Sequence, residues 1–186
     1  MISFPAVSSD EDVRQILRLQ RKNLAKNITP ETFEQQGFVT VEHDFLMLRQ
    51  LNDAEPSTLI KAEEEVVGYC LAMTRDMGAA VPILVPMFEV FKQIPWRGRF
   101  LNDFNYIVVG QVCVADGYRG QGLFDRMYGA YRERLETSYE LAVTEISHRN
   151  QRSIAAHRRV GFETAYTYQD ALNGEIWDVV VWSWRS

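Results

Sequence analysis

The sequence contains little cysteine, because only Cys70 and Cys113 occur among its 186 residues and both lie within apolar runs. A disulfide scaffold and a cysteine metal site are therefore not expected. Positive charge is also scarce, since 20 Lys and Arg against 25 Asp and Glu give a formal net charge of −5. This balance argues against nucleic acid or a membrane surface as a partner, because such binding usually needs a basic face.

Long hydrophobic segments are absent as well. The longest mainly apolar run, residues 79–88, contains Pro82 and Pro86 and is too short to span a bilayer. The first residues lack the basic stretch followed by an apolar stretch that marks a signal peptide. We therefore expect a cytoplasmic protein.

The chain does contain enough apolar residues (46%, with 12% aromatic) to form one domain over residues 1–186 with a substantial core. Patterning in the N-terminal half predicts a short strand at 4–7, helices over 10–26 and 42–51, and a β-hairpin of 57–62 and 66–73. A further helix is expected to begin at Thr29 and to end near Gly37. Residues 75–105 are expected to be an insertion that carries one helix.

The C-terminal half has the clearer pattern. Residues 106–114 are almost entirely apolar and predict a strand that is buried at the centre of a sheet. Apolar residues every four positions from Leu123 to Leu135 predict a helix with one buried face. A strand over 141–146, a helix over 152–160, and strands over 162–168 and 175–184 follow. The alternation predicts an α/β or α+β layered sheet.

The turn between the central strand and its helix has the sequence Arg119-Gly120-Gln121-Gly122. The first turn of a helix has unpaired backbone N–H groups and a partial positive charge, and glycines let the backbone approach a phosphate closely. The pattern favours an anion site, although an ordinary strand–turn–helix connection is an alternative. It lacks the Gly-Lys-Ser/Thr of an ATP-binding loop and the third glycine of a dinucleotide fold.

A second motif lies downstream, at Asn150, Ser153, His157 and Gly161-Phe162. Together, the two motifs resemble the GNAT superfamily of acetyl-CoA-dependent N-acyltransferases, over about residues 106–166. The resemblance implies a mixed, mostly antiparallel sheet of about seven strands, flanked by helices, with splayed central strands. Two positions depart from the family pattern. Phe124 replaces Gly or Ala and is expected to point into the core, and His157 replaces Tyr.

The resemblance also implies cofactor contacts. Backbone groups of Val112, Cys113 and Val114 would face the pantetheine arm, and Asn150 and Ser153 would lie near its thiol end. The diphosphate would be held by the backbone N–H groups of the turn, from Arg119, Gly120, Gln121 and Gly122 to Leu123 and Phe124.

Two side chains are candidates for proton transfer. Glu145 corresponds to a glutamate that serves as base in the ribosomal-protein alanine N-acetyltransferases of the superfamily; alternatively it pairs with Arg149 or Arg152 or caps the next helix. His157 is the candidate acid for the thiolate; alternatively it contacts the cofactor or packs. Weaker candidates for the base are Gln111, Asp103 and Glu89.

The function implied is N-acetyl transfer from acetyl-CoA, without a metal, to a primary amine of a small molecule or a peptide. A binding module that senses acyl-CoA without turnover, and a transferase of another acyl group, are the alternatives. Aromatic residues within 75–106, with Glu89 and Asp103, are a hypothetical acceptor pocket, although packing is their more ordinary role. A homodimer is left open.

Overall fold

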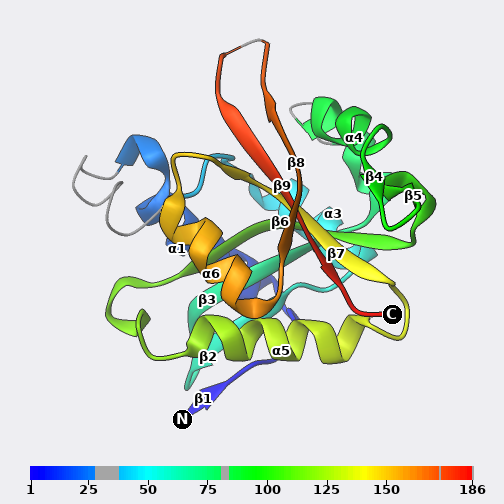
Figure 1. Ribbon diagram of the computed structural model, residues 1–186. Coiled ribbons are helices and arrows are strands. Elements are labelled where there is room, and N and C mark those ends of the chain that lie inside the picture. The colour runs from blue at the N-terminus through cyan, green and yellow to red at the C-terminus, as the bar shows by residue number, and fades with distance from the viewer. Residues whose placement is uncertain (28–37, 81–83, 172, 186) are drawn as a thin grey trace.

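A mixed sheet of seven strands forms the centre of the computed structural model, which describes residues 1–27, 38–80, 84–171 and 173–185 (Figure 1). All neighbouring strands are antiparallel except β6 and β7, which are parallel. This confirms the mostly antiparallel α+β sheet expected from the sequence. In sheet order the strands are β1 (Ile2–Ser3), β2 (Thr58–Ala62), β3 (Glu65–Met73), β6 (Tyr106–Val114), β7 (Leu141–Ser147), β9 (Ile176–Ser183) and β8 (Glu163–Gln169).

Helices cover both faces of this sheet. One apolar core lies under α1 (Asp10–Asn23), α3 (Phe45–Ala54) and α4 (Val85–Phe91), and the other lies under α5 (Leu123–Leu135) and α6 (Gln151–Val160). Alternate residues of one strand supply the two cores, as Leu141 and Val143 of β7 face α1 whereas Ala142 and Ile146 face α5. A second, two-stranded sheet joins β4 (Pro95–Trp96) to β5 (Arg99–Phe100), and 3₁₀ turns occupy Ala25–Asn27, Arg75–Ala80, Leu101–Asp103 and Asp116–Tyr118.

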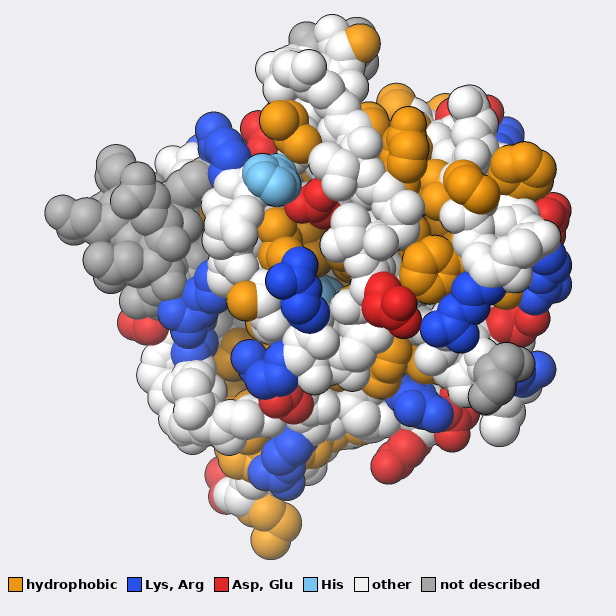
Figure 2. All heavy atoms as spheres, in the orientation of Figure 1, with side chains coloured by type: hydrophobic (Ala, Val, Ile, Leu, Met, Phe, Trp, Pro, Cys, Tyr) orange, Lys and Arg blue, Asp and Glu red, His pale blue; other side chains and the backbone are white. Residues whose placement is uncertain are grey.

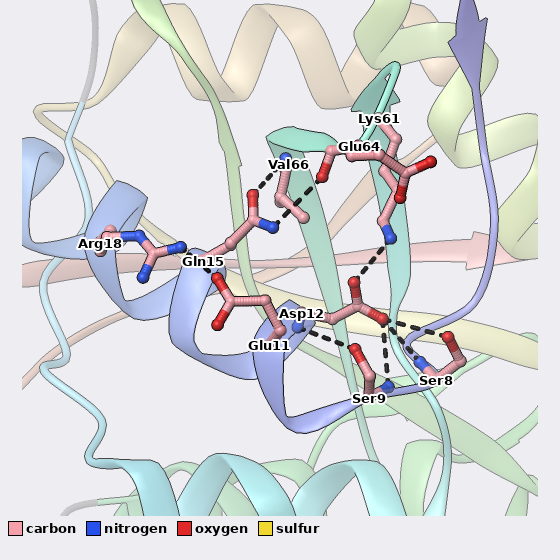
Figure 3. Close-up of polar contacts among 9 residues, drawn as sticks. All are labelled: Ser8, Ser9, Glu11, Asp12, Gln15, Arg18, Lys61, Glu64 and Val66. Carbon is pink, nitrogen blue, oxygen red and sulfur yellow. Dashed lines mark hydrogen bonds and ion pairs between the residues drawn. The ribbon is translucent and has the colours of Figure 1, made fainter.

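The start of α1 is fixed by local polar contacts (Figure 3). Ser9 caps the helix by accepting from the backbone N–H of Asp12, and the buried Asp12 carboxylate binds Lys61 of β2 at 2.7 Å. One turn later, Gln15 donates to the Glu64 carbonyl and accepts from the Val66 N–H, so it clamps the β2–β3 turn. These contacts hold α1 on the sheet and thereby position its C-terminal end beside the site described below.

Some boundaries differ from the sequence predictions. The first strand is Ile2–Ser3 rather than 4–7, where only an isolated bridge of Ala6 to Thr58 forms, because Pro5 has no N–H to donate to a ladder. The helix expected over 10–26 ends at Asn23, since Leu24 is extended and bridges Val39. The one expected over 42–51 runs from Phe45 to Ala54, after the capping residue Asp44.

The segment 75–105 contains the predicted helix, α4, and also the β4–β5 hairpin. The helix expected from Thr29 to Gly37 lies outside the described residues. That residues 1–186 form one domain, with 75–105 as an insertion, stays a prediction. No helix in the described part of the chain combines the length and apolarity that a membrane crossing requires.

Candidate active site

The two parallel strands at the centre of the sheet diverge to form a fork. β6 and β7 pair only over Tyr106–Val108 and Leu141–Val143. At the point of divergence the Thr144 hydroxyl donates to the Val109 carbonyl at 2.8 Å. The other edge of β6 pairs with β3 as far as Val114, so beyond Val109 only the edge that faces the fork lacks a strand partner. This confirms the splayed central strands that the resemblance implied.

A cavity of about 550 Å³ extends from the fork to the N-terminus of α5. Figure 2 shows this face of the molecule, where Lys and Arg side chains surround a hollow with hydrophobic side chains at its floor. Gln121 is not among the lining residues, because its side chain turns back and donates to the Gly117 carbonyl at 2.8 Å. The cavity brings together the other residues expected to bind the cofactor, namely Val112, Cys113, Val114, Arg119, Gly120, Gly122, Leu123, Phe124, Asn150 and Ser153.

The turn before α5 leaves backbone N–H groups open to this cavity. Gly120 and Gly122 have φ angles of 73° and 70°, which residues with a side chain adopt only at a cost. Gly122 is the N-cap of α5, and no side chain among the described residues caps the first turn of the helix. An anion such as a diphosphate fits this arrangement, because the unpaired N–H groups and the helix dipole both attract negative charge.

Charged side chains around the turn are bonded to one another or to the backbone. Arg119 donates from Nε to the Val114 carbonyl at 2.8 Å and from Nη2 to Asn23 Oδ1 at 2.6 Å, so it braces β6 against the end of α1. Asp125, in the first turn of α5, binds Arg159 of α6 at distances of 2.7 to 3.2 Å. This pair neutralises a carboxylate that would otherwise repel an anion bound at the turn.

Phe124 lies over the seam between α5 and α6. Its ring centroid is 5.0 Å from that of Tyr128 and 5.3 Å from that of His157, while part of the residue also lines the cavity. Phe124 thus packs against its i, i+4 neighbour Tyr128 at the edge of the core under α5 and α6, toward which the sequence predicts that it points. The bulky ring leaves the backbone turn open because it packs along the helix seam.

His157 is enclosed between the two helices, with 1% of its surface exposed, and does not line the cavity. Its Nδ1 lies 2.8 Å from the Ser153 carbonyl, which can only accept, so Nδ1 carries the ring proton and Nε2 accepts from the Tyr128 hydroxyl at 2.8 Å. Burial lowers the pKa of His157 to about 4. The acid role stays a prediction, but an enclosed imidazole that is neutral at pH 7 argues against it.

Glu145 projects from β7 just beyond the divergence, on the face of the sheet that packs against α1 and α3. Its Oε1 accepts from the Tyr168 hydroxyl at 2.7 Å. Burial raises the pKa of Glu145 to about 7, aided by the nearby Asp170 and opposed by the Tyr168 hydrogen bond. Glu145 is not among the residues that line the cavity. A pKa of about 7 lies in the range that a general base needs.

The weaker candidates for the base have structural contacts. Gln111 is buried in a network in which its Nε2 donates to the Val41 carbonyl, and its Oε1 accepts from Tyr69 and Gln20 at 2.6 and 3.0 Å. No motif in the sequence indicates this network, which also includes His43 (3.0 Å from Gln20). Outside it, Glu89 pairs with Lys92 at 2.6 Å and Asp103 accepts from the Phe100 N–H, so neither belongs to a cluster at the fork.

Metal ligation finds no support in the described part of the chain, where no three His, Cys, Asp or Glu residues gather closely enough to bind an ion.

Comparison with known proteins identifies the class of protein. A model of the GNAT acetyltransferase family matches residues 19–162, so the chain belongs to this family. No curated protein sequence matches it.

Solved structures share the fold at low sequence identity. The ribosomal-protein-S18-alanine N-acetyltransferase from Escherichia coli is 11% identical with a TM-score of 0.64, and the match covers 100% of this chain and 96% of that one. A chain of the NatC complex bound to Gag peptide and CoA is 11% identical with a TM-score of 0.67, and the match covers 98% of both chains. NAA60 from Arabidopsis thaliana in complex with acetyl-CoA is 13% identical with a TM-score of 0.62, and the match covers 98% of this chain and 99% of that one.

Proposed function

We propose that this chain transfers an acetyl group from acetyl-CoA to a primary amine. The observation that carries the proposal is the cavity that joins the uncapped N-terminus of α5 to the fork between β6 and β7. Two of the structural neighbours contain CoA or acetyl-CoA, and family membership supports an acyltransferase. When bound, acetyl-CoA supplies the acyl group as a thioester.

The chain's own residues would hold this cosubstrate mainly through the backbone. The N–H groups from Gly120 to Phe124 would bind the diphosphate, and those of Val112 and Val114 on the open edge of β6 would bind the pantetheine arm. The Cys113 N–H faces β3 instead, because Ala115, two residues further on, donates to the Val67 carbonyl of β3. Asn150 and Ser153 line the opposite side of the same cavity. An open backbone N–H in the fork would also stabilise negative charge on the thioester oxygen during attack.

Proton transfer is assigned to Glu145. The neutral amine attacks the thioester carbon, a C–N bond forms, and the C–S bond breaks with its electron pair leaving on the CoA sulfur. The amine's proton passes to the Glu145 carboxylate and then to solvent, and the thiolate takes a proton from solvent. A carboxyl with a pKa of about 7 is ionised in enough molecules at neutral pH to accept that proton. We assign no side-chain acid on α6, because His157 donates its Nδ1 proton to the Ser153 carbonyl inside the helix seam.

The acceptor is a small molecule or a peptide, and the neighbours named for an alanine N-acetyltransferase and for a bound Gag peptide favour a peptide N-terminus. A cytoplasmic location and a homodimer stay predictions.

The test is to incubate the purified chain with acetyl-CoA and a panel of peptides and small amines, and to follow release of free thiol. Amine-dependent release supports the proposal. Calorimetric binding of acetyl-CoA without thiol release for any amine would instead favour the acyl-CoA-sensing module, and no binding of any CoA thioester would refute both. Competition among acyl-CoAs separates an acetyltransferase from a transferase of another acyl group.

A further inference from the structure

A tyrosine on the edge strand reaches across its neighbour to Glu145. In the sheet order β7–β9–β8, Glu145 lies opposite Val179 of β9, and Val179 lies opposite Tyr166 of β8. Tyr168 is two residues further along β8, yet it is the side chain that reaches diagonally over β9 and donates to Glu145 Oε1 at 2.7 Å. Tyr166 stacks beside it, with ring centroids 6.4 Å apart and planes at 20°.

This hydrogen bond has a fixed direction. Burial and the neighbouring Glu145 raise the pKa of Tyr168 well above its ordinary value, so the phenol keeps its proton and can only donate to the ionised carboxylate. The bond uses Oε1 of Glu145. Among the contacts that the structure describes, none uses Oε2.

We propose that Tyr168 is a positioning residue for Glu145, holding Oε1 so that Oε2 points to the acceptor amine. The proposal rests on the role of Glu145 in the proposed function. It extends that role to the β8–β9 hairpin, which projects from the body of the molecule in Figure 1. Neither sequence motif includes a residue of β8, so the motifs alone do not indicate a role for this strand.

The charges around Glu145 set the sign of the expected effect. Asp170, the residue after β8, disfavours ionisation of Glu145, whereas the Tyr168 hydrogen bond favours it. Two polar side chains of the buried network beside α1, Gln111 and His43, add no charge. Gln111 is uncharged, and burial lowers the pKa of His43 to about 4, so His43 is neutral at pH 7. Removing the Tyr168 hydroxyl therefore raises the pKa of Glu145.

The experiment measures kcat against pH for Tyr168→Phe, with Tyr166→Phe as the matched control. Tyr166 belongs to the same strand and stack, but its hydroxyl makes no described contact with Glu145. We expect the acidic limb of the Tyr168→Phe profile to move up by about one pH unit, which is about a tenfold loss at pH 6 and convergence toward the wild-type rate above pH 9. The Tyr166→Phe profile should not move.

Titration of the Glu145 carboxyl by ¹³C NMR, in wild type and Tyr168→Phe without cosubstrate, gives a second readout that needs no turnover. A rise in the pKa of Glu145 in Tyr168→Phe supports the inference even if every amine tested fails as an acceptor, which would refute only the proposed function. An equal loss of kcat at every pH, an unchanged Glu145 titration, or an equal shift in Tyr166→Phe would overturn it. Thermal unfolding of both variants confirms that each is folded.

Discussion

The two sides of the fork differ in which groups are left available. On the α5–α6 side, the groups open to the cavity are backbone N–H groups, while the side chains of Arg119, Asp125 and His157 all have partners. On the β7–β8 side, a side chain, Glu145, makes one described hydrogen bond. Burial acts on both sides, lowering the pKa of His157 to about 4 and raising that of Glu145 to about 7. The same desolvation favours the neutral form of both groups, so the histidine is unprotonated at pH 7, while the carboxyl has a pKa in the range that the proposed base needs.

The largest effect should come from the β7–β8 side. Glu145→Gln keeps the shape and the oxygen that accepts from Tyr168 but cannot take a proton, so kcat should fall by about a hundredfold or more. Because the pKa of Glu145 is about 7 and the ionised form is the active one, the wild-type rate should fall as pH drops below 7, and this limb should vanish in the variant. Steady-state rates from pH 5.5 to 9 measure both. If Glu145→Gln had the wild-type pH profile, Glu145 would not be the base.

On the opposite side, Gly122→Val tests whether the backbone turn carries cosubstrate binding. Valine strongly disfavours a φ of 70°, so the turn should rearrange and KM for acetyl-CoA should rise roughly tenfold to a hundredfold. Gly129→Ala is the control, because it lies inside α5, where an added Cβ meets nothing within 4 Å. It should leave KM unchanged and stabilise the helix by about 0.5–1 kcal/mol. Steady-state kinetics with acetyl-CoA and thermal unfolding provide the two measurements, and an unchanged KM in the Gly122 variant would contradict the anion site.

His157→Phe distinguishes a structural role of this residue from a catalytic one. The variant removes the acceptor of the Tyr128 hydroxyl inside the core, so the free energy of unfolding should fall by about 1–3 kcal/mol while kcat stays within about twofold. Because the folded-state pKa of His157 is below its ordinary value, wild type should also lose stability as pH falls from about 6.5 toward 4, and the variant should lose less. Urea unfolding at several pH values measures this. A loss of kcat that is large at low pH and shrinks as pH rises, as expected when the protonated imidazole is the active form, would restore the acid role.

The smallest effect should come from Arg159→Ala. It leaves Asp125 unpaired in the first turn of α5, and KM for acetyl-CoA should rise about twofold to fivefold, because exposed ion pairs contribute little. Adding Asp125→Asn to this variant should restore KM, which distinguishes charge repulsion from lost packing. A double variant no better than Arg159→Ala would mean that Arg159 itself contacts the cosubstrate.

The elements that were predicted correctly from the sequence are those that depend on local residue patterns. The strand at 106–114, the glycine turn and the helix from Leu123 to Leu135 are contiguous, and each has its own periodicity or spacing. The prediction of a first strand over 4–7 was wrong, because Pro5 has no N–H to continue the ladder that the apolar pattern suggested. Ile154 and His157, spaced i, i+3 on α6, did carry a signal that His157 faces the core.

Non-local contacts could not be predicted in this way. The Tyr168–Glu145 hydrogen bond requires β9 to lie between β7 and β8, and the Gln20–Gln111 contact requires α1 to dock beside β6. Both join residues that are far apart in the chain, 23 and 91 positions respectively. Their partners follow from strand order and helix docking, which residue types alone do not specify.

The short ladder between β6 and β7 has a mechanical consequence. The backbone ladder that joins a four-stranded block to a three-stranded block is short, covering Tyr106–Val108 and Leu141–Val143, with the Glu140 N–H to Asn105 carbonyl bond at one end and the Thr144 hydroxyl at the other. Torsion between the blocks is therefore concentrated on those few peptide groups, and a molecule wedged between the diverging strands stiffens the whole sheet against shear.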